Sequence, residues 1–93
     1  MPIWAPAALA DLKEGLDHIA SDNEAAAARI LSALTEAGHR LDRFPRMGRP
    51  GKIFGTREFS VPRTPYFLVY YVKADGVEIA HVMHSSRRWP AEG

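Results

Sequence analysis

The sequence predicts an α+β fold in which an N-terminal helical hairpin packs on a C-terminal antiparallel sheet of three to four strands. Apolar residues recur every three or four positions from Pro6 to Phe44, which is the period of amphipathic helices. From Arg57 to Met83 the chain instead contains short segments rich in β-branched and aromatic residues, separated by proline and glycine, which is typical of strands. Both parts have an apolar face to bury, so we expect the helices to cover one face of the sheet.

The first helix is expected to begin at Pro6, because proline lacks an N–H and the first turn of a helix leaves that group without a helical partner. Its apolar stripe consists of Leu9, Leu12, Leu16 and Ile19. The segment from Asp11 to Asp17 is expected mostly on the opposite, solvated face. The polar residues 21 to 23 (Ser-Asp-Asn) break the pattern, and any of them can cap a second helix by accepting a backbone N–H.

The second helix is expected to follow immediately and to end before Pro45, which cannot donate to the helical hydrogen-bond ladder. Its apolar stripe consists of Ala27, Ile30, Leu34, Ala37, Leu41 and Phe44. Gly38 lies inside this helix, where glycine is about 1 kcal/mol less favourable than alanine. It therefore marks either a close approach of another segment or a weak point of the helix.

Residues 45 to 56 contain three glycines and two prolines, and we expect them to form an irregular surface loop without a regular element. From Arg57 the chain then alternates between polar and apolar residues. Phe59 and Val61 are expected on an apolar face of a strand, and Glu58 and Ser60 on its solvated face.

The rest of the chain predicts two more strands. After a turn at residues 62 to 65, residues 66 to 72 are apolar on both faces, which favours a strand in the middle of the sheet. A hairpin connection at residues 73 to 76 leads to a strand over residues 77 to 83, and residues 84 to 90 leave the sheet.

The composition restricts the class of protein. A chain of 93 residues is long enough for one domain with a modest core, and we expect a single domain over residues 1 to 93. The sequence has no cysteine, which excludes disulfides, a thiolate nucleophile and a zinc site built on cysteine. No signal peptide and no membrane span is recognisable, so we expect a cytoplasmic protein.

The charges are unevenly distributed along the chain. Residues 1 to 39 carry two basic and six acidic side chains, for a net charge of −4, whereas residues 40 to 63 carry seven basic and two acidic ones, for +5. We call the positive stretch the basic belt; its basic residues are Arg40, Arg43, Arg46, Arg49, Lys52, Arg57 and Arg63. Such a belt can attract an acidic protein or a phosphate backbone over long range, or it can simply keep a loop soluble.

The sequence predicts no metal and no cofactor. His81 and His84 are three residues apart at the end of a strand, so their side chains should point to opposite faces and cannot hold one ion together. Ser85 and Ser86 lie beside His84 without the turn that exposes a hydrolase nucleophile. The glycines of residues 45 to 56 neither follow a strand nor open a helix, which argues against a nucleotide-binding loop.

One group of residues has side chains suited to binding or catalysis. Arg57 starts one strand, His84 ends another, and the tail adds Arg87, Arg88 and Trp89, so we expect all five at one end of the sheet. Arginine binds phosphate or carboxylate, tryptophan offers a stacking face, and histidine can act as a general acid or base. Alternatively these residues are structural, with the tryptophan covering the core and the arginines in solvent.

Several segments, in their order and spacing, match one known pattern. They are Ala8-Leu-Ala-Asp-Leu12, Asp22-Asn-Glu-Ala-Ala-Ala27, Leu41-Asp-Arg-Phe-Pro-Arg-Met-Gly-Arg-Pro-Gly51, Gly55-Thr-Arg-Glu-Phe59 running into Pro65-Tyr-Phe-Leu-Val-Tyr70, and His84-Ser-Ser-Arg-Arg-Trp-Pro90. From about Trp4 to Pro90 the chain resembles the RelE/ParE toxin superfamily. The resemblance implies the toxin component of a type II toxin–antitoxin system, with the helical hairpin and antiparallel sheet already expected.

The superfamily contains ribosome-dependent mRNA endonucleases similar to RelE and DNA gyrase poisons similar to ParE. The endonuclease branch places lysines and arginines on the sheet, and this sequence has Phe67, Glu58 and Ser60 at those positions. The ParE-like branch is therefore favoured, which implies growth arrest through gyrase, a part in plasmid stabilization and no catalytic chemistry. In the endonuclease alternative, Arg57 and His84 would be the catalytic residues. A non-toxic binding module that kept the fold is a third possibility.

The resemblance also implies partners. A cognate antitoxin with an acidic, partly disordered segment is expected to neutralise the toxin, and we assign Arg46, Arg49 and Lys52 to that contact. The cluster of Arg57, His84, Arg87, Arg88 and Trp89 is assigned to the target, which is DNA gyrase or, in the alternative, the ribosome and its mRNA.

Overall fold

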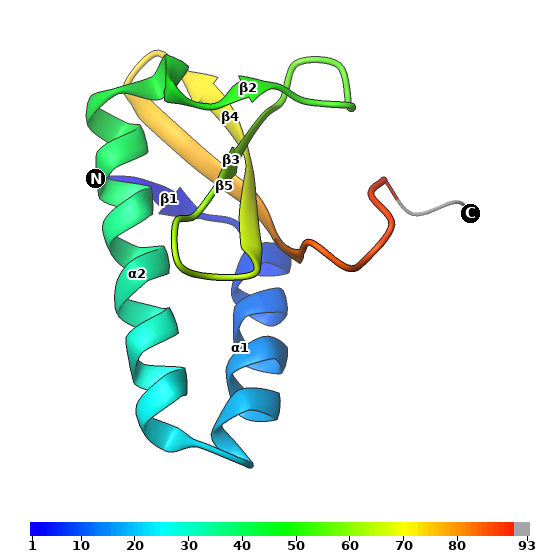
Figure 1. Ribbon diagram of the computed structural model, residues 1–93. Helices are drawn as coiled ribbons and strands as arrows, with labels where there is room; N and C mark the ends of the chain where they lie inside the picture. Colours follow the sequence, from blue (N-terminus) through cyan, green and yellow to red (C-terminus); the bar gives the residue numbers. More distant parts are fainter. Residues whose placement is uncertain (91–93) are drawn as a thin grey trace.

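The computed structural model describes residues 1–90 (Figure 1). Its elements are β1 (Ile3–Trp4), α1 (Pro6–Ala20), α2 (Glu24–Arg43), the short 3-10 helix η1 (Pro45–Met47), β2 (Arg49–Pro50), β3 (Arg57–Ser60), β4 (Tyr66–Lys73) and β5 (Gly76–His84). Within these residues, none of the helices combines the length and the apolar character that a membrane crossing requires.

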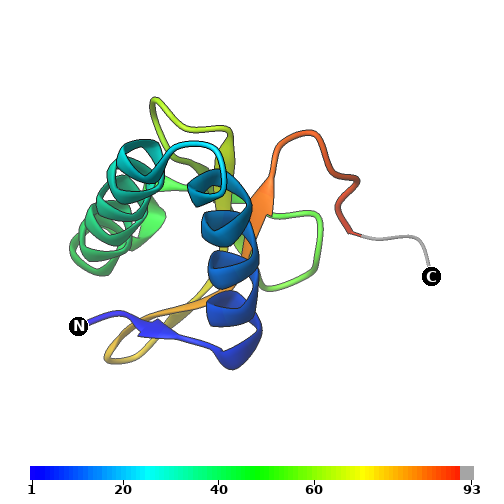
Figure 2. The same cartoon turned by 90° about the horizontal axis from the view of Figure 1, so that it is seen from below.

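Both helices have the ends that the sequence predicts. Pro6 occupies the first turn of α1, and the side chain of Asn23 caps α2 by accepting the backbone N–H of Ala26 at 3.0 Å. α2 ends at Arg43, two residues before Pro45. The two helices run antiparallel to each other and lie side by side (Figures 1 and 2).

The sheet has five strands in the order β1-β5-β4-β3-β2, so β4 is central, as its apolar sequence predicts. β1 pairs with β5 in parallel, and every other pair is antiparallel. The α+β prediction is confirmed, but the sheet is mixed and has more strands than expected. The additional strands, β1 and β2, are two residues long each, which is too short to produce an alternating pattern in the sequence.

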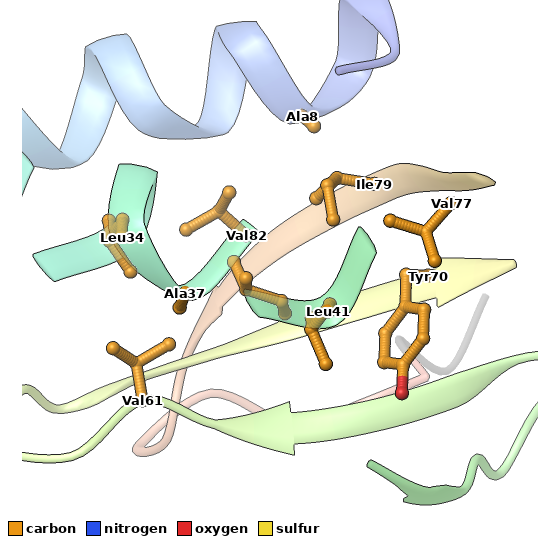
Figure 3. Close-up of a cluster of buried hydrophobic side chains, with 10 residues drawn as sticks. Ala8, Leu34, Ala37, Leu41, Val61, Tyr70, Val77, Ile79 and Val82 are labelled. Carbon is orange, nitrogen blue, oxygen red and sulfur yellow. The ribbon is translucent and has the colours of Figure 1, made fainter. Parts of the chain in front are cut away.

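The core lies between the helices and one face of the sheet (Figure 3). Leu34 and Leu41 of α2 pack there against Tyr70 of β4 and Ile79 of β5, and each of these side chains is at most 1% exposed. A Cβ atom on Gly38 would lie 2.7 Å from Cζ2 of Trp4. Of the two interpretations of Gly38, the close approach is therefore correct, and the approaching side chain comes from β1.

Three expectations based on the sequence pattern were wrong. Residues 45 to 56 are not wholly irregular, because η1 and β2 lie within them. Glu58 was expected in solvent and is only 4% exposed. Asp11 was expected on the solvated face of α1, but its carboxylate accepts the backbone N–H of Val82 at 3.0 Å and lies 3.1 Å from Nδ1 of His81. A backbone N–H on a strand edge needs an acceptor, and periodicity along one element does not reveal it.

Candidate functional site

The structure places Arg57 and His84 at opposite ends of the sheet, so the predicted single cluster is wrong. Arg57 of β3 pairs with Tyr70 of the central strand β4. His84 of β5 pairs with Tyr66 of the same strand β4. These two positions are four residues apart, which is about 13 Å along a strand. Because β3 and β5 are both antiparallel to β4, they run in the same direction. The first residue of β3 therefore cannot lie beside the last residue of β5.

Arg57 belongs instead with the loop that connects α2 to β3. We call the surface formed by Arg46, Arg49, Lys52 and Arg57 the loop-end surface. The buried carboxylate of Glu58 organises it: Oε1 accepts from Nη2 of Arg49 at 3.3 Å, and Oε2 accepts the backbone N–H of Lys52 at 3.0 Å. An ionised acceptor makes stronger hydrogen bonds than a neutral one, so this single side chain holds two points of the loop.

Tyr70 of β4 holds the start of the same loop in place. Its hydroxyl donates to the carbonyl of Pro45 at 2.6 Å and accepts the backbone N–H of Gly48 at 3.0 Å. Burial raises the pKa of Tyr70, while the Gly48 N–H and the positive charge of Arg57 act in the opposite direction. A side chain on Gly48 would meet the Tyr70 hydroxyl at 2.5 Å, so this close contact requires glycine.

The loop also has an ordered tip with an exposed aromatic ring. The backbone N–H of Gly51 donates to the carbonyl of Thr56 at 2.8 Å, and the Thr56 hydroxyl donates to the carbonyl of Ile53 at 2.6 Å. Between them, the side chain of Phe54 is 100% exposed. The backbone around Phe54 is thus held by hydrogen bonds while the ring contacts solvent.

The rest of the basic belt is divided between two regions. Arg40 and Arg43 lie in the last turn of α2, where Nη2 of Arg40 is 4.0 Å from the sulfur of Met47 and the guanidinium of Arg43 lies 5.6 Å from the ring of Phe44. Arg63 lies in the turn after β3, at the end of the sheet away from Arg57. The belt is therefore continuous in sequence but not on the surface.

The opposite end of the sheet carries the remaining candidate residues. His84 and Arg87 line a pocket of about 380 Å³ that α1 closes with Glu14 and His18. Nη2 of Arg87 is 3.2 Å from Oε1 of Glu14, a pair in which both side chains are exposed. We call His84 and the tail residues Arg87, Arg88 and Trp89 the tail surface.

His84 is held in one orientation by its neighbours. Its Nδ1 accepts the backbone N–H of Ser86 at 3.1 Å and lies 2.7 Å from the Ser86 hydroxyl. The ring of Tyr66 contacts it edge to face at 5.3 Å. Both contacts of Nδ1 therefore come from Ser86, two residues further along the chain.

Within the tail surface, Trp89 contacts a different histidine, His81. The two rings lie 5.1 Å apart between ring centroids, and His81 in turn lies 3.1 Å from Asp11. Arg88, which directly precedes Trp89 in the chain, is exposed. The predicted cluster of five residues is thus divided into Arg57 at the loop end, His84 with Arg87 in the α1 pocket, the exposed Arg88, and Trp89 on His81.

Two residues that organise the loop-end surface were missed from the sequence, and so was the exposed ring at its tip. Glu58 was treated as a solvated strand residue, although one of only two acids among the seven basic residues of the basic belt is expected to be paired. Tyr70 was treated as core, and its hydroxyl partners come from 22 and 25 residues earlier. Phe54 carried a visible signal, because an apolar ring in a loop of glycine and proline has no core to join.

Solved structures support the same fold. The chain is similar to a structure titled "Chromosomal ParDE TA system from P. aeruginosa", with a TM-score of 0.78 and 23% identity over 89% of this chain and 92% of that one. At that level of identity the match shows the arrangement of helices and strands. This chain therefore has the same fold as that structure.

Sequence comparison then shows the family. The family described as "ParE toxin of type II toxin-antitoxin system, parDE" matches residues 3–89. The chain is also 39% identical, over 94% of its length and 90% of the relative's, to a protein of Sinorhizobium fredii (strain NBRC 101917 / NGR234) named "Putative toxin Y4kP". This chain belongs to the ParE toxin family, in agreement with the ParE-like branch that the sequence favours.

Proposed function

We propose that this ParE-family toxin inhibits DNA gyrase in the cytoplasm, arrests growth by blocking replication, and is neutralised by an acidic antitoxin. The observation that carries the choice of gyrase over mRNA cleavage is the separation of Arg57 from His84. RNA cleavage requires a base at the 2′-hydroxyl and a cation at the same phosphate. These two residues approach β4 at positions about 13 Å apart.

The contacts of His84 and Arg87 support the same choice. Nδ1 of His84 already accepts a hydrogen bond from Ser86, and Arg87 beside it is paired with Glu14. A toxin that acts by binding needs neither a free base nor an unpaired cation at that position. We therefore propose that the chain acts as a binding protein without catalytic chemistry.

We assign the two surfaces to the two partners. The loop-end surface, with Arg46, Arg49 and Lys52, is proposed to receive the antitoxin, because an acidic segment is attracted by its positive charge. The tail surface, with His84, Arg87, Arg88 and Trp89, is proposed to contact gyrase. Arg57 moves from the target group to the antitoxin group, since it donates to the carbonyl of Gly48 in the same loop.

Induced expression in bacteria tests the proposal. Growth arrest with accumulated gyrase–DNA cleavage complexes is the expected result, and co-expression of the antitoxin should restore growth. Arrest with cuts in ribosome-bound mRNA would instead identify an endoribonuclease, and normal growth would identify an inert binding module.

Substitutions test the roles of the tail surface and the loop-end surface separately. Arg87→Ala combined with Trp89→Ala should reduce cleavage-complex formation while antitoxin binding persists. Reversal of Arg46, Arg49 and Lys52 to glutamate should weaken antitoxin binding and its dependence on salt. Unchanged antitoxin affinity in the reversed variant would remove the loop-end surface from the interface.

A further inference from the structure

A small hollow lies on the loop-end surface, between two arginines. It has a volume of about 250 Å³, and its lining residues are Arg46, Pro50, Gly55, Thr56, Arg57 and Val72. Arg46 and Arg57 are thus its two charged lining residues, and Pro50 and Val72 are its apolar ones. No acidic residue is among the lining residues.

The charges of this hollow are not balanced inside the protein. Within residues 1–90, carboxylates lie within ion-pair distance of Arg49, Lys73 and Arg87, whereas none does so for Arg46 or Arg57. Two like charges that share a hollow repel each other, and this is unfavourable for the isolated protein. A bound anion would remove that repulsion.

Arg57 is also held in place before any ligand binds. Its Nη1 donates to the carbonyl of Gly48 at 2.6 Å, and Gly48 itself is fixed by Tyr70. This bond occupies one of the five N–H donors of a guanidinium. Because Arg57 is already held, binding a ligand would cost little further side-chain entropy, which favours tight binding.

An exposed apolar side chain, that of Phe54, lies next to the hollow. Phe54 immediately precedes Gly55 of the lining, and its side chain is fully exposed at the tip of the hydrogen-bonded loop. Aromatic residues and arginines dominate the residues that contribute most to protein–protein binding. An exposed aromatic side chain beside two arginines, of which Arg57 is held in place, therefore fits a protein partner.

We propose that the hollow between Arg46 and Arg57 binds a carboxylate side chain of the antitoxin, and that Phe54 inserts into an apolar pocket of the same partner. This inference rests on the proposed function, because it names the contact within the toxin–antitoxin complex. Arg49, which is paired with Glu58, does not line this hollow.

A carboxylate side chain fits this hollow better than a nucleic-acid phosphate. Val72 and Pro50 provide an apolar wall, against which the methylene groups of an aspartate or glutamate can pack. A phosphodiester would bring oxygen atoms and a sugar to the same wall without apolar stems to match. Guanidinium groups bind carboxylates through two parallel hydrogen bonds, which both arginines can provide.

The test measures the affinity of the full toxin chain for the antitoxin encoded in the same operon. Arg46→Gln and Arg57→Gln should each weaken binding about 30-fold, as expected for a residue central to an interface. Phe54→Ser should weaken it to a similar extent. Arg57→Lys keeps a cation and a donor for the Gly48 carbonyl but lacks the planar fork, so it should fall between the wild type and Arg57→Gln.

Arg63→Gln is the matched control, because it removes the same charge at the other end of β3 and should change the affinity by less than about 3-fold. Wild-type affinity in Arg46→Gln and Arg57→Gln would overturn this inference. So would a loss of affinity for a short DNA duplex with antitoxin binding intact, which would make the hollow a phosphate site. A wild-type toxin that neither arrests growth nor binds the antitoxin would instead refute the proposed function.

Discussion

Replacing Glu58 with alanine should loosen the loop from Gly48 to Thr56 and lower the free energy of unfolding of the whole chain. The carboxylate accepts the backbone N–H of Lys52 at 3.0 Å, and a hydrogen bond to a charged group contributes about 1.5–3 kcal/mol. The ion pair with Arg49 adds at most about 1 kcal/mol, because the Arg49 side chain is 72% exposed. Alanine also removes the unfavourable burial of the carboxylate, so we expect a net loss of about 2 kcal/mol.

Urea unfolding of the isolated toxin, followed by circular dichroism, measures this loss. The midpoint of thermal unfolding should fall by about 10 °C, given the size of the chain. Glu58→Gln keeps an oxygen that can accept the Lys52 N–H and loses only the charge, so it should lose about 1 kcal/mol. Hydrogen exchange at the Lys52 amide should become faster in Glu58→Ala and change less in Glu58→Gln.

Glu78→Ala is the control, because Glu78 is also a glutamate on the sheet with a basic partner. Its Oε1 lies 3.0 Å from Nζ of Lys73, but both side chains are partly exposed, so its loss should stay below about 1 kcal/mol. Equal losses in Glu58→Ala and Glu78→Ala would refute the reasoning, because the burial of Glu58 and its bond to the loop backbone would then contribute nothing.

Three further predictions concern the contacts of Tyr70 and Gly38. Tyr70→Phe should lose about 2 kcal/mol in urea unfolding, because it leaves the Pro45 carbonyl and the Gly48 N–H without their partner. Because burial raises the pKa of Tyr70 from 10.0, an unfolded chain loses this proton first. Stability should therefore be complete below pH 10 and fall as the pH rises beyond it, less steeply in Tyr70→Phe. Gly38→Ala places a Cβ 2.7 Å from Cζ2 of Trp4, so urea unfolding should show a net loss of about 1 kcal/mol despite the better helix propensity of alanine.

Each of these three predictions has an outcome that would contradict it. Wild-type stability of Tyr70→Phe would mean that solvent satisfies the loop as well as the hydroxyl does. Identical alkaline unfolding of wild type and Tyr70→Phe would assign the titration to other groups. A stabilised Gly38→Ala would show that the indole of Trp4 moves aside without cost.

The sequence predicts the basic residues of the loop-end surface but not Glu58 and Tyr70, which hold its loop in place. The loop-end residues Arg46, Arg49 and Lys52 were identified from charge alone, and the structure brings them into one loop. The separation of Arg57 from His84 follows from a topology that the sequence already predicts, because alternate strands of an antiparallel meander run in the same direction. The hollow between Arg46 and Arg57 was not predictable, since its lining comes from η1, β2, β3, β4 and the loop between β2 and β3.

By itself, the amino-acid sequence determined the two helices, their ends and the three longer strands. These depend on local effects: proline at Pro6 and Pro45, the cap at Asn23, and the periods of the apolar residues. Only the tertiary structure decided the short strands β1 and β2 and the burial of Glu58. The physical reason is that short strands and buried charges are stabilised by partners far away in the chain, and alternation along one segment carries no information about what covers it.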